Sequence, residues 1–410
     1  MSRALRIAMI GCRGVPATYG GIERHVEEVG SRLAHRGHDV TVFTRPGYTR
    51  GPRTGEHRGM RTVALPAIGT KHLEALSHSG LAAARAVGQG YDIFHFHALG
   101  PGLFASVPRA ARRGRVVLTV HGLDFERSKW SPTAAWCIRK AEAVAVRSAH
   151  GVVVVASGLV RHYRDKFGVT PTFIRNGVHA CSPSSPVSAG ERRTVMFVGR
   201  LTPEKGPHLL IEAFGRILDP ELRLVIVGGS SHTDDYVIGL DRAAREDDRV
   251  DLRGYVYGQE LVDLYCRARL FVQPSSLEGM PLTLLEAAAA GTPLLASDIA
   301  VHREMLEPLA SGRRLFQAGS VDELEGQLRK ALGANLDDEL AGASAFRDEV
   351  LRRYSWDDVV DELEAHYLSV AKPAHPGRPF RPDPAVSIPT QQRRGRADAC
   401  FTADRPGVDR

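Results

Sequence analysis

The 410-residue sequence has no apolar run close to the ~18 residues that a membrane-spanning helix needs. Its N-terminus carries no signal-peptide pattern, because Met1–Arg6 leads directly into a strand-like segment. Only five cysteines are present, an odd number with no close pair. We therefore expect reduced thiols in a cytoplasmic protein. These absences exclude a secreted protein held by disulfides, a transmembrane protein and a zinc ribbon.

Charge is divided unevenly along the chain. Residues 1–190 hold 26 Lys and Arg against 11 Asp and Glu, whereas residues 191–371 hold 20 against 32. This asymmetry favours a basic face on the first part that meets an anionic surface. The alternative is an arginine-rich composition set by codon use, with 7 Lys among 54 basic residues, but that would enrich both parts.

Two series of short apolar runs alternate with amphipathic helical patterns, which predicts parallel sheets covered by helices on both faces. The first series of expected strands is Leu5–Gly11, Asp39–Thr44, Arg61–Pro66, Tyr91–His97, Val116–Gly122, Gly151–Ser157 and Thr172–Val178. The second series is Arg193–Leu201, Leu222–Gly229, Val250–Gly254, Leu270–Pro274 and Pro293–Asp298. Expected helices include Ile22–Arg36, Thr133–Ala149 and Trp356–Val370, the last with Ser355 as its N-cap.

A Ser/Pro/Gly-rich segment separates the two series, as expected for two domains in a chain of this length. The predicted fold is α/β, with two facing Rossmann-like domains and a cleft at the carboxyl ends of their strands. The expected N-terminal domain is 1–180, the linker 181–191 and the C-terminal domain 192–354. A helix at 355–371 is expected to cross back to the N-terminal domain. Residues 372–410, rich in Pro and Arg, are expected to be a disordered tail.

A glycine-containing loop, Gly11–Glu23, follows the first expected strand and opens a helix near Ile22. Glycines at such a point let a ligand oxygen approach backbone N–H groups, and a helix N-terminus attracts anions. The spacing matches neither the dinucleotide-binding pattern nor the Walker loop. An ordinary tight turn would explain it equally well.

The first expected strand of the second series ends in Val198–Gly206. The planar guanidinium group of Arg200 can donate two parallel hydrogen bonds, and Lys205, five residues later, carries a positive charge on a flexible side chain. Together these two groups could bind a diphosphate. The alternative is a solvated loop, since isolated Arg/Lys pairs are usually solvated.

Two carboxylates, Glu278 and Glu286, lie eight residues apart at the start of an expected helix. Backbone N–H groups of Met280, Leu282 and Thr283 would be free there to bind an anion. A carboxylate beside them suits two neighbouring hydroxyls of a sugar or ribose. The alternative is a helix cap at Glu278 and an exposed charge at Glu286.

Together these segments resemble the retaining glycosyltransferases of the GT4 family, whose GT-B fold has two facing Rossmann-like domains. Val198–Gly206 is similar to that family's V-G-R-L-x-x-x-K-G segment, and Pro274–Asp298 to its segment with two Glu residues. Arg175–Val178 resembles its interdomain P-N-G-V. Gly14–Glu23 and Gly122–Trp130 resemble a polysaccharide-forming, rhamnosyltransferase-like subset. The resemblance spans about residues 5–371, with Met280-Pro281 as a departure that removes one N–H donor.

The resemblance implies roles for individual residues. Glu278 would bind donor-sugar hydroxyls and Glu286 the ribose, while Arg200 and Lys205 would hold the diphosphate. The implied catalytic residues are His121, Arg200, Lys205 and Glu278. The implied donor-binding residues are Gly20, Gly21, Gly199, Gly279, Met280, Leu282, Thr283, Glu286 and Tyr255. Acceptor-side candidates are His97, Arg127 and Lys129. For the two histidines, which end expected strands, a packing role is the alternative.

The implied reaction moves a hexosyl group from a nucleotide-diphosphate sugar, with retention, to a glycan, lipid-linked or small-molecule acceptor. The implied setting is synthesis of cell-surface polysaccharide or glycoconjugate. No metal or other cofactor is expected, because no D-x-D pair that could hold a metal lies in a suitable loop. The Asp pairs at 234–235 and 247–248 have the pattern of helix-surface charges. The basic clusters Arg109–Arg115, Arg50–Arg61 and Lys71–His72 predict peripheral contact with the anionic inner face of the cell membrane. Solvated arginines and a soluble acceptor are the alternative.

Other classes of function remain as alternatives. A nucleotide-sugar epimerase of the same fold would grip the same donor, but it needs acid/base carboxylates beyond Glu278. A non-catalytic nucleotide-sugar-binding protein would have no use for His121. No nucleic-acid partner is expected, because no known nucleic-acid-binding motif is present and residues 191–371 are acidic.

Overall fold

The computed structural model describes residues 3–17, 20–48, 54–70, 73–126, 131–230 and 233–371. Arg127, Lys129, the Lys71–His72 cluster and the expected tail at 372–410 lie outside the described residues, as do residues 50–53 of the Arg50–Arg61 cluster. Among the helices that are described, none has both the length and the apolar character needed to cross a membrane.

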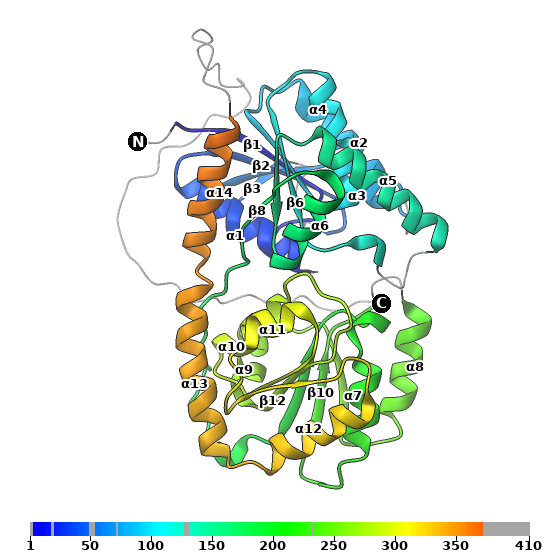
Figure 1. Ribbon diagram of the computed structural model, residues 1–410, viewed down its shortest axis with the longest axis vertical. Helices are drawn as coiled ribbons and strands as arrows, with labels where there is room; N and C mark the ends of the chain where they lie inside the picture. The colour runs from blue at the N-terminus through cyan, green and yellow to red at the C-terminus, as the bar shows by residue number, and fades with distance from the viewer. Residues whose placement is uncertain are drawn as a thin grey trace. The chain divides into compact units, whose positions relative to one another are not determined.

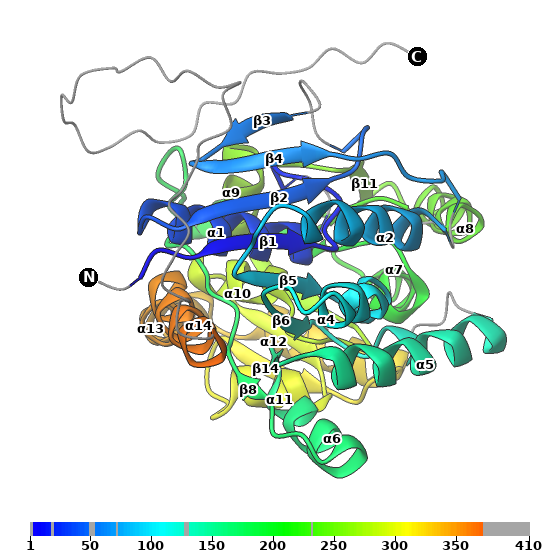
Figure 2. The same ribbon diagram turned by 90° about the horizontal axis from the view of Figure 1, so that it is seen from above.

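The N-terminal domain is built on an eight-stranded sheet in the order β3-β4-β2-β1-β5-β6-β7-β8 (Figures 1 and 2). All neighbouring strands are parallel except the β3–β4 hairpin. The strands are β1 Arg6–Ile10, β2 Asp39–Thr44, β3 Thr54–His57, β4 Met60–Ala64, β5 Ile93–His97, β6 Arg115–Val120, β7 Gly151–Val154 and β8 Thr172–Phe173. The helices are α1 Gly21–His35, α2 Glu74–Val87, α3 Leu99–Gly102, α4 Ser106–Ala110, α5 Pro132–Ser148 and α6 Ser157–Phe167.

The C-terminal domain has a six-stranded parallel sheet in the order β11-β10-β9-β12-β13-β14. The strands are β9 Thr194–Val198, β10 Arg223–Val227, β11 Val250–Gly254, β12 Ala268–Gln273, β13 Leu294–Ser297 and β14 Arg313–Phe316. The helices are α7 Pro207–Gly215, α8 Asp234–Ala244, α9 Gly258–Arg267, α10 Leu282–Ala289, α11 Ala300–Leu306, α12 Val321–Gly333, α13 Leu336–Arg353 and α14 Trp356–Val370. The predicted α/β class with two Rossmann-like domains is confirmed.

Three expectations about strands differ from the structure. β3 and β14 were not expected, and the run Thr172–Val178 forms a strand only at β8. Pro171 precedes β8, and the residues after Phe173 leave the sheet toward the C-terminal domain, where Val178 pairs with Ser355 in an isolated bridge. The apolar character of that run reflects burial in a connecting segment as well as in a sheet.

Strand order explains where the conspicuous loops lie. In the first sheet β1 lies between β2 and β5, and in the second β9 lies between β10 and β12, so connections leave these strands toward opposite sides. Ligands of open α/β sheets bind at the carboxyl ends of strands at such points. The loop after β1 contains Gly20, and the loops after β9 and β12 contain Arg200 and Glu278.

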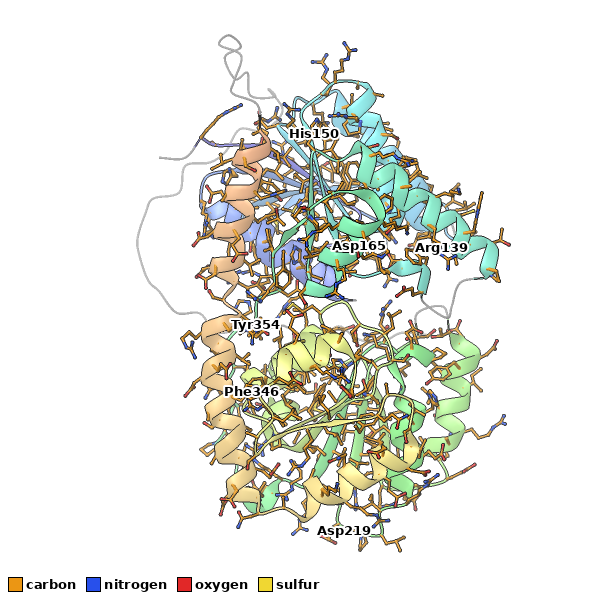
Figure 3. All side chains as sticks on the ribbon, viewed as in Figure 1. Arg139, His150, Asp165, Asp219, Phe346 and Tyr354 are labelled. Carbon is orange, nitrogen blue, oxygen red and sulfur yellow. The ribbon has the colours of Figure 1, made fainter. Side chains whose placement is uncertain are left out.

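The chain passes between the two domains at two neighbouring places. Val178 N–H donates to the carbonyl oxygen of Tyr354 at 2.8 Å, so the segment after β8 runs beside the junction of α13 and α14. Tyr354 marks this junction in Figure 3. A Cβ on Gly177 would lie 2.5 Å from the Trp356 ring, so only glycine fits at this approach.

Helix α14 lies on the N-terminal domain, alongside α1. Ser355 caps it by accepting from Asp357 N–H at 3.2 Å. Arg36, which directly follows α1, pairs with Asp361 of α14 at 2.6 Å, and the Tyr367 hydroxyl contacts His95 Nδ1 at 2.6 Å. These polar contacts add to the buried face of α14, which includes Val360, Leu363 and Tyr367.

Candidate active site

A pocket opens where the end of β6 faces the loops after β9 and β12. Its lining consists of Gly122, Leu123, Arg200, Glu204, Lys205, Leu277, Glu278 and Gly279. Three of the four predicted catalytic residues, Arg200, Lys205 and Glu278, are therefore brought together. The fourth, His121, directly precedes pocket-lining Gly122. Both domains contribute to this one pocket.

Glu278 is held by a set of donors. Lys205 Nζ lies 2.6 Å from both of its carboxylate oxygens, and the Ser275 hydroxyl and Gln273 Nε2 reach Oε1 at 2.8 and 2.9 Å. Burial opposes ionisation of this carboxyl, but Lys205, His302 and Ser275 outweigh it and hold the pKa of Glu278 below its ordinary value. The pocket thus contains a fixed carboxylate joined to an ammonium group.

Glu278 and Gly122 meet across the domains because two glycines allow it. A Cβ on Gly279 would lie 1.8 Å from the carbonyl oxygen of His121. Gly122 has a φ of +151°, and a Cβ there would lie 3.8 Å from Gly279 Cα. The backbone of the N-terminal domain can therefore come close to the segment that carries Glu278.

The glycine-containing loop after β1 also reaches the C-terminal domain. Helix α1 begins at Gly21, one residue before the expected Ile22, and Gly20 is its N-cap. Glu23 accepts a hydrogen bond from Arg13 N–H at 2.9 Å, which ties the loop to the helix. A Cβ on Gly21 would lie 3.6 Å from Leu282, so this N-terminus lies against the start of α10.

The residues at the start of α10 lie beyond the pocket lining. The helix begins at Leu282 with Pro281 as its N-cap. The Met280 carbonyl oxygen accepts from Asn176 Nδ2 at 3.3 Å. The Thr283 hydroxyl donates to Gln273 at 3.2 Å. The backbone N–H groups of Leu282 and Thr283 are in the first turn, where helices leave such groups without intrahelical acceptors.

Glu286 has different surroundings from Glu278. The Tyr265 hydroxyl donates to its carboxylate at 3.1 Å. Burial raises the pKa of Glu286, and the positive charge of Arg24 and the Tyr265 hydrogen bond offset this only in part. Arg24 belongs to α1 of the N-terminal domain, so this second carboxylate also lies close to both domains.

Gly199 and Tyr255 lie at the strand ends next to Arg200. Gly199 N–H donates to Val227 O at 3.0 Å, and its own carbonyl oxygen would lie 1.7 Å from a Cβ on Gly228. The Tyr255 hydroxyl donates to Ser230 O at 3.1 Å, and its ring stacks on that of Tyr257. Neither of these two predicted donor-binding residues is among those that line the pocket.

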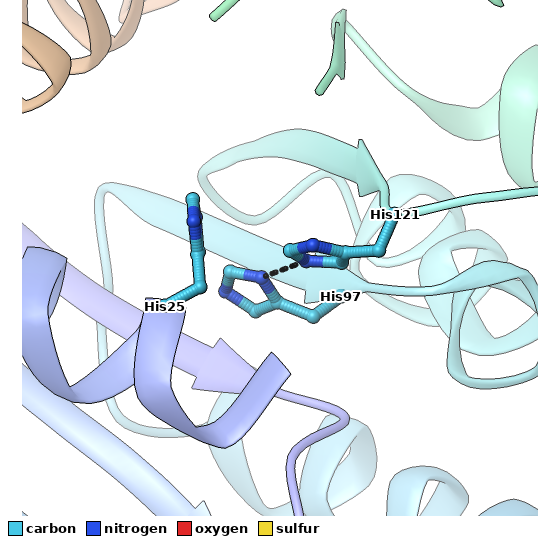
Figure 4. A group of neighbouring side chains, drawn as sticks. All are labelled: His25, His97 and His121. Carbon is cyan, nitrogen blue, oxygen red and sulfur yellow. Dashed lines mark hydrogen bonds between the residues drawn. The ribbon is translucent and has the colours of Figure 1, made fainter. Parts of the chain in front are cut away.

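Two further histidines, His25 and His97, lie close to His121 (Figure 4). His97 Nδ1 lies 3.3 Å from His121 Nε2, and the His25 ring meets the His121 ring edge-on with centroids 4.9 Å apart. His25 Nδ1 contacts Asn176 Oδ1 at 3.0 Å. Burial lowers the pKa of His25 to about 4 and, together with the neighbouring histidines, holds the pKa of His97 well below its ordinary value. His97, predicted on the acceptor side, is fully buried beneath His121.

Sequence reasoning missed several residues of this site. Glu204 and Leu277 line the pocket, and Gln273 and Ser275 hold Glu278. Ser275 lies within the segment that resembled the GT4 family, which was a usable signal. His25 lies inside a helix and gave none.

Comparisons with known proteins agree with this geometry. Residues 19–180 match the description "Glycosyltransferase Family 4", and residues 182–342 match "Glycosyl transferases group 1". Glycogen synthase of Mycobacterium tuberculosis is 27% identical over 94% of this chain and 100% of its own length. GDP-mannose-dependent alpha-mannosyltransferase of the same species is 29% identical over 89% of this chain and 97% of its own length. Sucrose-phosphate synthase from Thermosynechococcus elongatus superposes with a TM-score of 0.77 at 23% identity, covering 89% of this chain and 99% of that structure.

Two facing Rossmann-like domains with a pocket between them define the GT-B fold of glycosyltransferases. This chain belongs to glycosyltransferase family 4.

Proposed function

We propose that this glycosyltransferase moves a hexosyl group from a nucleotide-diphosphate sugar, with retention at the anomeric carbon. The observation that carries the proposal is one pocket in which Arg200, Lys205 and Glu278 face Gly122 beside His121. The mannosyltransferase relative is GDP-mannose-dependent, which supports a nucleotide-diphosphate sugar as the donor class. The acceptor is a glycan, a lipid-linked molecule or a small molecule, in cell-surface polysaccharide or glycoconjugate synthesis.

The chemical demand on the pocket is stabilisation of a departing diphosphate. Arg200 and Lys205, both in the segment after β9, bring two cationic side chains to the pocket. A preorganised donor aimed at developing charge is typically worth about 3–4 kcal/mol when removed from a comparable site. We therefore propose transfer in which these protein groups, rather than a metal ion, take the charge of the leaving group.

The two carboxylates suit the donor's hydroxyl groups. Glu278 is ionised, so it accepts hydrogen bonds from two hydroxyls of the sugar while Lys205 and Gln273 fix its orientation. Glu286 is proposed to accept from the ribose. Retention follows if the acceptor hydroxyl attacks the anomeric carbon from the side of the leaving group. The bond between the anomeric carbon and the diphosphate oxygen breaks as the new glycosidic bond forms. The proton of the acceptor hydroxyl passes to an oxygen of the departing diphosphate.

A donor panel tests the proposal. The full chain is incubated with UDP-, GDP- and dTDP-sugars, with and without acceptor, and free nucleoside diphosphate and sugar products are measured. One donor class is expected to release nucleoside diphosphate. An epimerase would instead return an isomerised nucleotide sugar with no release, and a binding protein would change nothing.

The first prediction concerns the groups assigned to the reacting end of the donor. His121→Ala and Arg200→Ala are each expected to lower kcat/KM about a hundredfold or more, with the Arg200 loss mainly in kcat, because its charge acts on the leaving group. His35→Gln, on an exposed helix end, is the matched control and should keep full activity. Full activity of either variant would remove that residue's assigned role.

We also propose that the basic part of the N-terminal domain brings the enzyme to an anionic membrane surface on the cytoplasmic side. The side chains of Arg109, Arg112 and Arg113 are exposed near the end of α4, and Trp136 of α5 is 57% exposed. An anionic surface adds about 1 kcal/mol per nearby basic residue. Salt-sensitive flotation with anionic vesicles is expected, whereas absence of binding at low salt would contradict this proposal.

A further inference from the structure

The three histidines behind the pocket come from three separate elements. His25 lies on α1, His97 ends β5, and His121 follows β6 (Figure 4). One ring nitrogen from each lies within 4.8 Å of the others. The transfer reaction proposed above uses His121 but gives His25 and His97 no role in it.

The spacing of these nitrogens is close to that of a metal site. Zinc binds imidazole nitrogens at about 2.0–2.1 Å in tetrahedral geometry, which places two such nitrogens about 3.4 Å apart. His97 Nδ1 and His121 Nε2 are already 3.3 Å apart. The remaining separations are at most 4.8 Å, so they must close by up to about 1.4 Å, a shift within the reach of small side-chain rotations.

The hydrogen bond between His25 and Asn176 is of the kind that usually orients a metal-binding histidine. A metal-ligating histidine usually donates its second ring N–H to a carbonyl or carboxylate oxygen, which fixes the ring and its tautomer. His25 Nδ1 lies 3.0 Å from Asn176 Oδ1, so the Nε2 lone pair is left for another partner. The contact is buried and connects α1 to the segment that leaves the N-terminal domain.

Hydrogen bonding within the protein leaves the cluster incomplete. His97 is fully buried, yet its Nε2 has no hydrogen-bond partner. In a neutral His97 the proton can sit on this Nε2, which leaves the lone pair on Nδ1, the nitrogen that faces His121 Nε2.

We propose that His25, His97 and His121 together bind one divalent transition-metal ion of the zinc class. Three neutral imidazoles suit zinc, copper, cobalt and nickel far better than magnesium or calcium, which prefer oxygen ligands. His121 is partly exposed next to the pocket, which gives the ion an entry path and leaves its fourth position for water. The proton balance is simple, since neutral rings bind the ion without releasing a proton.

A consequence for catalysis rests on the proposed function. The imidazole of His121 cannot serve the sugar pocket and an ion at once, so zinc bound to the three histidines should lower sugar transfer. Chelation should then restore it. A metal ion bound at this site would therefore inhibit sugar transfer. It would take no part in the transfer reaction itself.

Direct binding of Co²⁺ tests the site without reference to activity. The full chain, treated with chelator and dialysed, is titrated with Co²⁺ while visible absorption is followed. One equivalent is expected to give the intense absorption of a four-coordinate ion, and one equivalent of Zn²⁺ should abolish it. Absence of this absorption at millimolar Co²⁺ would overturn the proposal.

Variants separate the three histidines from other surface histidines. His121→Gln and His25→Gln should each weaken Co²⁺ binding at least a hundredfold, and Asn176→Ala about tenfold. His35→Gln is the control and should bind as the parent does. If His97→Gln fails to fold, the His121 and Asn176 variants still decide the matter. Equal binding by the parent and His121→Gln would assign the ion to another place and contradict the proposal.

The two proposals fail separately. A chain that gives the Co²⁺ spectrum but acts on no donor would contradict the proposed function and leave the metal site standing. A chain that transfers sugar at equal rates with zinc and with chelator, and gives no spectrum, would contradict only the metal site.

Discussion

Glu278 and Glu286 show how far surroundings separate two identical side chains. Lys205, Ser275 and Gln273 surround the first, so its pKa is lowered despite burial. Burial raises the pKa of the second, and the Tyr265 hydroxyl and the charge of Arg24 offset this only in part. Glu278 therefore carries its charge before any ligand arrives. Glu286 gains from hydroxyl donors that a ligand brings.

Glu278→Gln is the sharpest test of this difference. The amide has one acceptor oxygen instead of two and no negative charge, so it binds sugar hydroxyls less well and leaves Lys205 without its partner charge. We expect kcat/KM to fall about 100- to 1,000-fold. Steady-state kinetics with the best donor measures this, beside Glu246→Gln as a control on an exposed residue of the same domain. Activity within a fewfold of the parent would contradict a sugar-binding role.

The sequence predicted that the loops after β9 and β12 carry residues of the site, but it did not predict the ion pair between Lys205 and Glu278. Lys205 and Glu278 are 73 residues apart and were expected to serve different parts of the donor. Their contact depends on how β9 and β12 align in the sheet, which no local pattern encodes. His25 was missed because a histidine on the buried face of a helix has the pattern of an ordinary core residue.

Among the elements, α1 carries a buried charge cluster outside the pocket. Glu28 accepts from Arg32 Nη1 at 2.5 Å and lies 3.2 Å from Arg58 and 2.8 Å from His179. Its own side chain is 3% exposed. Burial favours the protonated form, but His179, Arg32 and Arg58 outweigh it and hold the pKa of Glu28 far below its ordinary value.

The pH dependence of stability should reveal this cluster. An unfolded Glu28 takes up a proton near pH 4.5, whereas the folded one stays ionised, so its contribution is complete above that pH and declines below it. Glu28→Gln should lower the free energy of unfolding at pH 7 by about 1–3 kcal/mol. Urea unfolding is measured for both variants from pH 7 down to pH 3. The free energy of unfolding of Glu28→Gln should fall less steeply with decreasing pH than that of Glu246→Gln. An unchanged acid decline would contradict this account.

The strands that could be predicted from the sequence are the buried ones, because burial requires a run of apolar residues. β1, β2 and β5 are apolar runs, and the helices around them have clear periodicity. β3 has the sequence TGEH and β14 the sequence RRLF, and both are edge strands with polar residues, so apolar pattern could not find them.

The loop between β12 and α10 allows a test of domain approach. Gly279→Ala would bring a methyl group into the His121 carbonyl oxygen, which requires the backbones to separate. We expect sugar transfer to fall tenfold or more while the melting temperature stays within a few degrees, because the contact is between domains and outside either core. Gly239→Ala, a helical glycine in α8 with open space, is the control. Unchanged transfer would show that this approach is not needed.

At the scale of the whole molecule, α14 links the end of the described chain to the centre of the first sheet. The Tyr367 hydroxyl is buried against His95 Nδ1, while His95 Nε2 contacts Thr119 Oγ1 at 2.7 Å. Tyr367→Phe leaves a buried ring nitrogen without its partner. We expect a loss of about 1–3 kcal/mol in the free energy of unfolding, measured by urea denaturation. Leu368→Ala, on the exposed side of the same helix, is the control and should change little.

The two neighbouring passages of the chain at Val178 and Ser355 also set how the enzyme can open. Since they are joined by a bridge and flanked by Gly177 against Trp356, they act as a single hinge. Rotation about this axis moves atoms in proportion to their distance from it. Gly279, next to the Met280 that Asn176 contacts, should therefore shift little, while the parts of the two domains farther from this hinge should separate most.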